Sequence, residues 1–464
     1  MQVEVQRAEA LNLGDGAVGV GDGGPGKRRR QVVHETHNAR LAGPRLVSRS
    51  AGYRGHMWRL ERIVLVTALG TSLWLAVAAC STPVKPGGPS PTPTNPGAAP
   101  SPAVPAVPDP PLAFDRDGVS LGEPADGQFT VYADTAYYMR DDLSATDIPT
   151  LIAADLVAGK PRWSKPVATD AMAAKWGPLR VAVVEGKPRV VISYLARLKG
   201  TGTQADRELL RVIALDAGDG TRLWTVDIDD DKMPQGASYR FSTFSPPSIV
   251  AFTDEHVVLG TDESVIVLDS RNGNQRWNSA GFRPSALDAG TVVGASFSGT
   301  TRKVAGRSAA DGKESWSNTD PFDRVEQLGS GLVAVASTTA TRLLEAKTGT
   351  VKANVAGSHT CAHDSESIVV CWRFTEHVLA IDAANGKTLW ELPDTSADRI
   401  IPRVLTLRRG MIYSTAGSNG PVIIDARTGK DKVTSVVITP TRVIPGFGLV
   451  LSERGGLFAH KATG

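Results

Sequence analysis

Short apolar runs recur along the last three quarters of the chain, and polar turns separate them. Typical runs cover residues 211–215, 265–268, 378–381 and 422–424, and they consist mainly of Val, Ile and Leu. Runs of this length are short for helices, and β-branched residues favour strands that are covered on both faces. An acidic residue ends each of these runs and a glycine follows four positions later, which is typical of a tight turn. The pattern predicts a fold made of many short strands.

The same turn is part of a longer repeat. An acid, three residues, a glycine, three residues and a tryptophan follow one another, and five of the nine tryptophans occupy the last position. The complete copies are Asp155, Gly159, Trp163; Asp216, Gly220, Trp224; Asp269, Gly273, Trp277; and Asp382, Gly386, Trp390. The eroded copies are Ser308, Gly312, Trp316; Glu345, Gly349, Ala353; Asp425, Gly429, Val433; and His460, Gly464.

The spacing of this repeat indicates the architecture. Successive acid positions lie 35 to 61 residues apart, and most spacings are close to 40. A period near 40 is typical of a propeller blade with four short strands. Eight copies predict an all-β, eight-bladed β-propeller over residues 114–464, with seven blades as the alternative. Because the last copy is cut short, a strand near residues 112–118 is expected to complete its blade.

Each position of the repeat has a structural role. The acid ends a strand, and its carboxylate can accept backbone N–H groups of the following turn. The glycine stands where the chain reverses and needs a positive φ. The tryptophan can bury its rings against the neighbouring blade if its indole N–H finds an acceptor. We therefore interpret these residues as scaffold rather than as a catalytic site.

The first 113 residues carry a different signal. Residues 1–56 show no sustained periodicity and are interpreted as a disordered basic extension or a start assigned too early, with a basic arm as the alternative. Met57 opens a second start: Arg59 and Arg62 precede an uncharged apolar stretch, 63–79, which predicts a signal peptide over 57–79. Its ending, Ala78-Ala79-Cys80, resembles a bacterial lipobox.

That resemblance implies lipidation at Cys80, with acyl chains such as palmitate, and a mature chain beginning there. Two or more acyl chains give stable membrane anchoring. A plain signal anchor with an incidental cysteine is the alternative. Residues 81–113 hold 12 of the 30 prolines, so 80–113 is predicted to be an extended linker. Together these segments predict a domain tethered to the extracytoplasmic face of a bacterial membrane.

The repeat resembles the tryptophan-docking motif of the pyrroloquinoline-quinone-like (PQQ-like) β-propellers. The family includes quinoprotein dehydrogenases and lipoproteins of the outer-membrane-assembly type. The dehydrogenases use a disulfide between adjacent cysteines and a calcium-holding acid cluster, whereas the cysteines here are Cys80, Cys361 and Cys371. The resemblance therefore implies a propeller without catalytic residues, cofactor or metal, and not an enzyme.

Two local patterns allow alternatives. Cys361 and Cys371 flank a turn and a short apolar run, which predicts a hairpin closed by a disulfide in an oxidising compartment. A metal site of His359, Cys361 and His363 on one strand face is the competing interpretation. Residues 227–232 are rich in aspartate, but they lack the glycine and distant glutamate of a calcium loop and favour a solvated loop.

The overall charge narrows the class of partner. Lys and Arg exceed Asp and Glu by only three, 51 against 48, which argues against nucleic-acid binding. The polar stretch 197–207 falls where the repeat spacing is longest, and long loops on rigid scaffolds often bind partners. We predict a monomeric, lipid-anchored scaffold that binds an envelope protein or cell-wall polymer. A sensor binding a small ligand in the propeller channel and a quinoprotein-like oxidoreductase are the alternatives.

Overall fold

The computed structural model describes residues 107–464, except for 141–148, 169–171, 230–231, 234–247, 262, 300 and 395–397. The extension 1–56, the signal peptide 57–79, Cys80 and most of the linker lie outside the described residues. Within the described part of the chain, no helix is long and apolar enough to cross a membrane.

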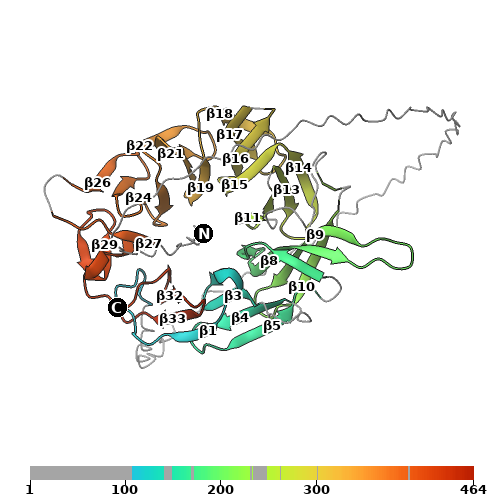
Figure 1. Ribbon diagram of the computed structural model, residues 1–464, viewed down its shortest axis with the longest axis horizontal. Helices are drawn as coiled ribbons and strands as arrows, with labels where there is room; N and C mark the ends of the chain where they lie inside the picture. The colour runs from blue at the N-terminus through green and yellow to red at the C-terminus, as the bar shows by residue number, and fades with distance from the viewer. Residues whose placement is uncertain are drawn as a thin grey trace, which may run out of the picture. The chain divides into compact units, whose positions relative to one another are not determined.

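The described chain folds into eight antiparallel sheets, the blades, arranged as a propeller (Figure 1). Blade 1 contains β2 (Phe129–Tyr132), β3 (Thr135–Arg140), β4 (Thr150–Asp155) and β5 (Pro161–Pro166). Blade 2 contains β6 (Met172–Trp176), β7 (Arg180–Val184), β8 (Lys187–Leu198), β9 (Arg207–Asp216) and β10 (Arg222–Ile228). Blade 3 contains β11 (Ser248–Phe252), β12 (His256–Gly260), β13 (Ser264–Asp269) and β14 (Gln275–Ala280). Blade 4 contains β15 (Phe282–Asp288), β16 (Thr291–Ser298), β17 (Thr301–Ser308) and β18 (Glu314–Asn318).

The second half repeats this plan. Blade 5 contains β19 (Arg324–Gly329), β20 (Leu332–Ala336), β21 (Ala340–Glu345) and β22 (Val351–Ala356). Blade 6 contains β23 (Thr360–His363), β24 (Ile368–Arg373), β25 (His377–Asp382) and β26 (Thr388–Leu392). Blade 7 contains β27 (Arg403–Arg408), β28 (Met411–Thr415), β29 (Pro421–Asp425) and β30 (Asp431–Val433). Two short 3-10 helices, η1 (Ala125–Gly127) and η2 (Gly417–Asn419), complete the described elements.

Blade 8 joins the two ends of the domain. It contains β31 (Arg442–Ile444), β32 (Phe447–Leu451) and β33 (Leu457–Lys461), and β1 (Val119–Gly122) pairs with β33 as the fourth strand. The predicted eight-bladed, all-β fold is thus confirmed, and the seven-bladed alternative is wrong. The closing strand lies a few residues later than expected. In the predicted range, Phe114 forms an isolated bridge with Ala462, and the N–H groups of Leu112 and Asp115 donate to the oxygens of Gly464 and Lys461.

Blade 2 differs from the other blades in its first strand. Both β6 and β7 pair with β8: Trp176 lies opposite Tyr194, and Arg180 lies opposite Val191. The two strands therefore act as one first strand that is interrupted between residues 176 and 180. The same blade has the longest strands, β8 and β9, which run side by side as a hairpin (Figure 1).

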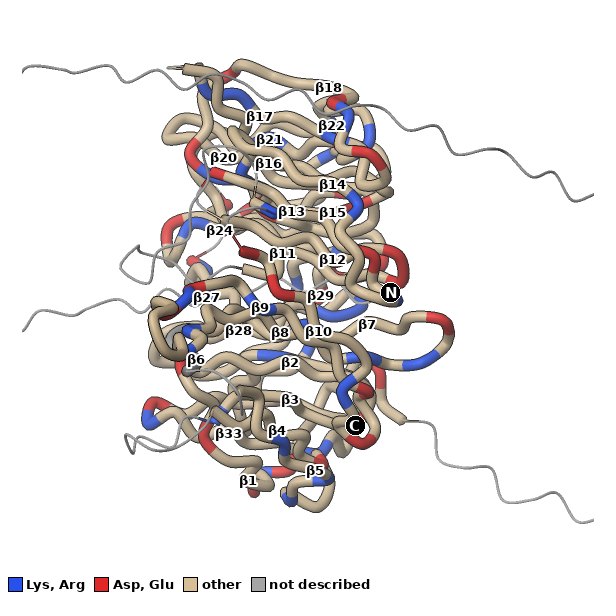
Figure 2. The backbone as a smooth tube through the Cα atoms, turned by 90° about the vertical axis from the view of Figure 1, so that its right-hand side faces the viewer, with Lys and Arg blue, Asp and Glu red and all other residues tan. Residues whose placement is uncertain are grey.

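The strand order gives the ring two unlike faces. In an antiparallel blade, the turns after the first and third strands lie at one end, and the turn after the second strand lies at the other. We call the first side the turn face, because it carries the Asp–Gly turns. We call the second side the hairpin face, because it carries the β8–β9 loop. Figure 2 shows the ring edge-on, with the β7 end and the C-terminus on the same side.

The core is divided among the blade junctions. The described residues form eight hydrophobic clusters, and each combines side chains of two neighbouring blades. One cluster, for example, joins Ile192 and Ile213 of blade 2 to Tyr137 and Leu151 of blade 1. First strands of neighbouring sheets also contact one another, as β15 does with β19 and β27 does with β31. The first strands therefore surround the axis of the ring.

Candidate functional site

Five tryptophans of the repeat dock on the next blade in the same way. Each indole Nε1–H donates to the backbone oxygen of the residue after the next acid position, over 2.8–3.1 Å. The pairs are Trp163 with Ala217, Trp224 with Ser270, Trp277 with Ala309, Trp316 with Ala346, and Trp390 with Ala426. The indole N–H is therefore satisfied at every one of these junctions.

The glycines and acids shape the surface that receives each tryptophan. Repeat glycines 159, 220, 273, 312, 349, 386 and 429 all have φ between 67° and 77°. At Gly312 a Cβ atom would lie 2.7 Å from Cε3 of Trp277, so a side chain would displace the ring. Oδ1 of each repeat aspartate accepts backbone N–H groups two or three residues further on: Asp155, Asp216, Asp269, Asp382 and Asp425.

Asp269 is the most strongly held of these carboxylates. Arg271 and Arg276 both donate to its Oδ2, over 2.8 and 2.7 Å. The Arg271 guanidinium, with Arg276 beside it, holds the pKa of Asp269 well below its usual range. The oxygens of this acid are engaged within the turn, as expected for a structural carboxylate.

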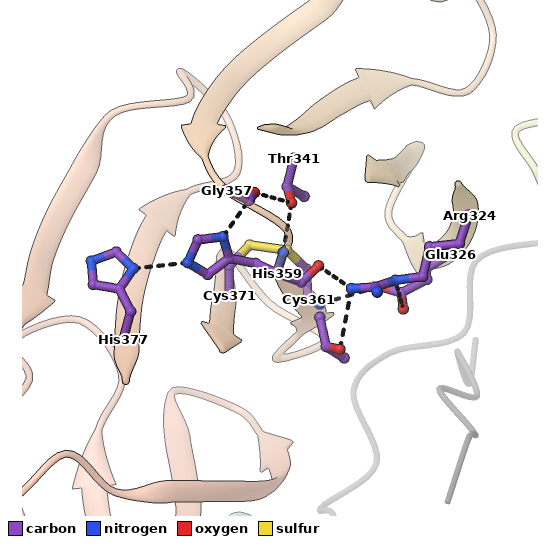
Figure 3. The surroundings of a disulfide bond; sticks show 9 residues. Arg324, Glu326, Thr341, Gly357, His359, Cys361, Cys371 and His377 are labelled. Atoms are coloured by element: carbon purple, nitrogen blue, oxygen red, sulfur yellow. Dashed lines mark hydrogen bonds and ion pairs between the residues drawn. A yellow bond between two sulfur atoms is a disulfide. The ribbon is translucent and has the colours of Figure 1, made fainter. Parts of the chain in front are cut away.

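At the junction of blades 5 and 6, where Ala353 stands at the tryptophan position, a polar cluster lies beside a disulfide (Figure 3). Cys361 on β23 and Cys371 on β24 lie opposite each other, are fully buried, and are joined by that bond. Around them, Arg324 donates to the backbone oxygen of His359 and to Oγ1 of Thr360. The cluster therefore connects the first strand of blade 5 with that of blade 6.

Two histidines extend this cluster. Nε2 of His359 lies 2.8 Å from Nδ1 of His377, and Nδ1 of His359 lies 3.1 Å from the oxygen of Gly357. Since a carbonyl only accepts, a neutral His359 carries its proton on Nδ1 and accepts from His377. Burial is the main reason that the pKa of His359 is lowered. The outer nitrogen of His377 faces Glu391 at 3.6 Å.

The junction of blades 7 and 8, where Val433 occupies the tryptophan position, is covered by residues just before β1. Asp109 forms ion pairs with Arg408 and Arg409, and the Tyr413 hydroxyl donates to the oxygen of Pro111 over 2.7 Å. Phe114 packs against Tyr413, with 6.2 Å between the ring centres. Residues 107–114 therefore pack on the domain, although composition assigns 107–113 to the linker.

The competing interpretation, a metal site, is not assembled. Cys361 is in the disulfide, His363 is the last residue of β23, and His359 lies just before that strand. Among the described residues, no group of three or more His, Cys, Asp and Glu could hold a metal ion. In the aspartate-rich stretch, Asp227 pairs with Arg211, with 2.6 Å between Oδ1 and Nε.

One small pocket lies between blades 4 and 5 at the hairpin face. It has a volume of about 170 Å³ and is lined by Arg302, Pro321, Phe322, Asp323, Ser337 and Thr338. The Arg302 guanidinium stacks 4.2 Å from the centre of the Phe322 ring and donates to the backbone oxygen of Asp323. Since ligand pockets usually measure roughly 300–1,000 Å³, this pocket is too small for most small-molecule ligands.

The β8–β9 hairpin extends from blade 2 at the hairpin face. Its tip, residues 199–206, is almost entirely exposed, and Figure 1 shows the hairpin, in green, projecting beyond the sheets. Gly200 N–H donates to Asp206 across the tip, and Arg197 forms an ion pair with Glu208 at its base. The ordered polar tip makes this hairpin a candidate surface for a partner protein.

Sequence reasoning missed the polar contacts at the junction of blades 5 and 6 and at that of blades 7 and 8, where the tryptophan is absent. The signal was present, because Ala353 and Val433 break the repeat and leave a small residue where a large ring is expected. The residues that make these contacts, however, lie outside the repeat: Arg324 lies on β19, and Asp109 lies in the proline-rich stretch. No local pattern marks either residue.

Comparisons with known proteins agree with this architecture. The family model described as outer membrane protein assembly factor BamB matches residues 118–286 and 279–463. Comparison with curated proteins gave no match.

Among solved structures, BamB from Moraxella catarrhalis is 16% identical (TM-score 0.43), with 75% of this chain and 97% of that chain covered. The computationally designed Ika8 protein is 14% identical (TM-score 0.47; 76% and 99% covered). The quinohemoprotein alcohol dehydrogenase ADHIIG from Pseudomonas putida HK5 is 12% identical (TM-score 0.44; 76% and 78% covered). Because the family model spans most of the chain, the predicted PQQ-like propeller family is confirmed, and the protein belongs to the family described as outer membrane protein assembly factor BamB.

Proposed function

We propose that this protein is a lipid-anchored, non-catalytic scaffold that binds a partner protein in the bacterial cell envelope. The observation that carries the proposal is the match of residues 118–463 to a family described as an outer membrane protein assembly factor. A family of that description implies contact with other proteins of a membrane machine. We transfer only this class of role, and not a particular machine.

The hairpin face supports a binding role. The β8–β9 tip is exposed, polar and braced by the hydrogen bond from Gly200 to Asp206. Its strands continue into the packed core of blade 2, where Ile192 and Ile213 are fully buried. A braced loop on a rigid sheet loses little conformational entropy on binding, which favours recognition.

The repeat carboxylates support a non-catalytic role. They are engaged in their own turns, as Asp382 is with the N–H groups of Ala384 and Asn385. A catalytic acid or base must be able to reach a substrate. These acids hold the turns that receive the tryptophans, so their carboxylates have a structural role.

The anchor completes the proposal. Lipidation of Cys80 would place a stretch of 26 residues, 81–106, between the membrane and the described domain. A proline-rich chain spans about 3.1 Å per residue, so this stretch reaches on the order of 80 Å. The domain would then reach partners well away from the lipid surface.

A crosslinking pull-down of the full-length protein from intact cells tests the proposal. Two variants accompany the wild type: Cys80→Ala, which removes the acceptor of the lipid, and a hairpin variant in which a Gly-Ser turn replaces residues 199–206. We expect specific envelope proteins with the wild type and their loss with both variants. Metabolic labelling with a fatty acid checks the lipid separately and should label only chains that carry Cys80.

The alternatives predict other results. Retention of a redox cofactor by the purified protein would favour an oxidoreductase and contradict a non-catalytic role. Partner proteins captured equally by the hairpin variant would show that another surface binds them. Absence of any protein above background would overturn the scaffold proposal.

A further inference from the structure

The first strands of the blades carry an unusual set of charges at one end. These strands surround the axis and all begin at the hairpin face, because each leads into a turn on the turn face. Within their first three positions, the eight strands hold four arginines and one acid: Arg283, Arg324, Arg403 and Arg442, and Glu326. Topology therefore gathers these guanidinium groups around one axial end of the ring.

Two of these arginines act within the fold. Nε of Arg324 lies 2.8 Å from Glu326, and Arg324 also donates to the backbone of His359. The other oxygen of Glu326 accepts the N–H of Cys361 over 3.3 Å, so this acid is fully engaged. The guanidinium of Arg442 lies 6.0 Å from the ring centre of Phe129. These contacts hold the side chains of Arg324 and Arg442 against the protein at this axial end.

The other two arginines are available for a ligand. Arg283 on β15 and Arg403 on β27 are both exposed, although each is followed by a buried residue that holds its strand in the sheet. Neither has an ion-pair partner among the residues that the structure describes. Two guanidinium groups without ion-pair partners therefore start from rigid strands of blades 4 and 7 at the same axial end of the ring.

We propose that this axial end of the hairpin face, with Arg283 and Arg403 as its contact residues, binds a short acidic segment of the partner protein. Guanidinium groups pair with carboxylates through two parallel hydrogen bonds, so successive Asp or Glu side chains fit arginines spaced around the axis. A nucleic acid is a poorer match, because the chain as a whole carries a net charge of only +3. The inference rests on the proposed scaffold function and gives the chemistry of its partner.

A labelled peptide with a short run of glutamates provides the probe, and fluorescence anisotropy gives its affinity for the full chain. A glutamine peptide of the same length is the control ligand. We expect the acidic peptide alone to bind, and the affinity to fall when salt rises from about 50 to about 200 mM. The double variant Arg283→Gln/Arg403→Gln should weaken binding by about tenfold or more, because it removes both free guanidinium groups.

A second double variant controls for net charge. Lys313→Gln/Lys347→Gln removes the same number of charges from two repeat turns, 308–312 with the residue after it and 345–349, on the opposite face and should leave the affinity unchanged. All four substituted residues are exposed or at the surface, and thermal unfolding checks that the variants stay folded. Equal weakening by both double variants, or no binding of the acidic peptide to the wild type, would overturn the proposal.

The pull-down separates this inference from the proposed function. Capture of partner proteins by Arg283→Gln/Arg403→Gln at wild-type levels would overturn the acidic-segment site and leave the scaffold function intact. Peptide binding without any captured partner would support the acidic-segment site and overturn the scaffold function.

Discussion

Five blade junctions and the remaining three are held together by different means. Where a tryptophan is present, one side chain fills the space between two blades and donates one hydrogen bond, always to the equivalent backbone oxygen. At the junctions of blades 5 and 6, 7 and 8, and 8 and 1, the contacts are unlike one another. At the junction of blades 5 and 6, Arg324 donates to the backbone of His359, beside the buried disulfide and the histidine pair of blade 6. A packed segment with an ion pair covers the junction of blades 7 and 8, and a strand from the other end of the domain completes blade 8.

The difference shows which junctions of a repeat fold can respond to pH or to redox state. A tryptophan junction relies on burial and geometry, and it has little dependence on pH or redox state. Beside the junction of blades 5 and 6, blade 6 carries a disulfide and His359, whose pKa is lowered mainly by burial, so redox state and pH can change this region. Variants that remove one contact from each kind of junction can test this contrast.

Loss of a docking tryptophan should have the largest effect. Trp224 is only 9% exposed, and truncation to alanine would leave a cavity between blades 2 and 3. We expect Trp224→Ala to lower the free energy of unfolding by about 3–5 kcal/mol, measured by urea unfolding. Trp224→Phe should cost much less, because it keeps an aromatic ring and because Arg189 still donates to the Ser270 oxygen.

Hydrogen exchange would locate the damage. Faster exchange in β10 and β13 with Trp224→Ala would show a junction that opens locally. If Trp224→Ala lost no more stability than Trp224→Phe, the result would contradict a role for the volume of the ring.

Removal of the disulfide should come next. Cys361 and Cys371 close a loop of ten residues, for which the chain-entropy contribution is about 3 kcal/mol. We expect Cys361→Ala/Cys371→Ala to lose a comparable amount, and a reducing agent to destabilise the wild type but not this variant. A thiol titration of the unfolded, unreduced domain beginning at residue 107 should find no free thiol. Two free thiols would contradict the bond.

The ion pair before β1 should contribute less. Asp109 accepts two charge-assisted hydrogen bonds from Arg408, and both side chains are mostly buried. We expect Asp109→Asn to cost about 2 kcal/mol and to make residues 107–118 more accessible to a protease. The matched control is Asp117→Asn, an exposed acid of the same segment, which should change neither property.

Whether a feature could be predicted from the sequence depends on how far apart its residues lie along the chain. The turn from Asp216 to Trp224 is local and periodic, so its strand, its reversal and its docking ring are all predictable. The disulfide was predictable because a short hairpin separates Cys361 from Cys371. The pairing of Asp109 with Arg408 joins positions 299 residues apart, and only ring closure brings them together. The same holds for the axial arginines, which come from four different blades.

The histidine pair should give the smallest effect and the clearest contrast with the tryptophan junctions. The pKa of His359 is lowered chiefly by burial, and His377, Arg373 and Arg324 add repulsion. A neutral His359 donates to Gly357 and accepts from His377, so a second proton on Nε2 would oppose the N–H of His377. In the unfolded chain the same imidazole titrates at about 6.5.

The sign of the pH effect follows from these two pKa values. Because the folded pKa lies below the unfolded one, the unfolded chain binds the proton first as the pH falls. The stability is fully present above about pH 6.5 and is lost as the pH falls below it. We expect the urea midpoint of the wild type to fall more steeply between about pH 7 and 5 than that of His359→Gln, which cannot titrate. His256, whose pKa is also lowered by burial, leaves a residual slope in both proteins. Parallel curves for the two proteins would show that junction 5–6 is no more sensitive to pH than a tryptophan junction.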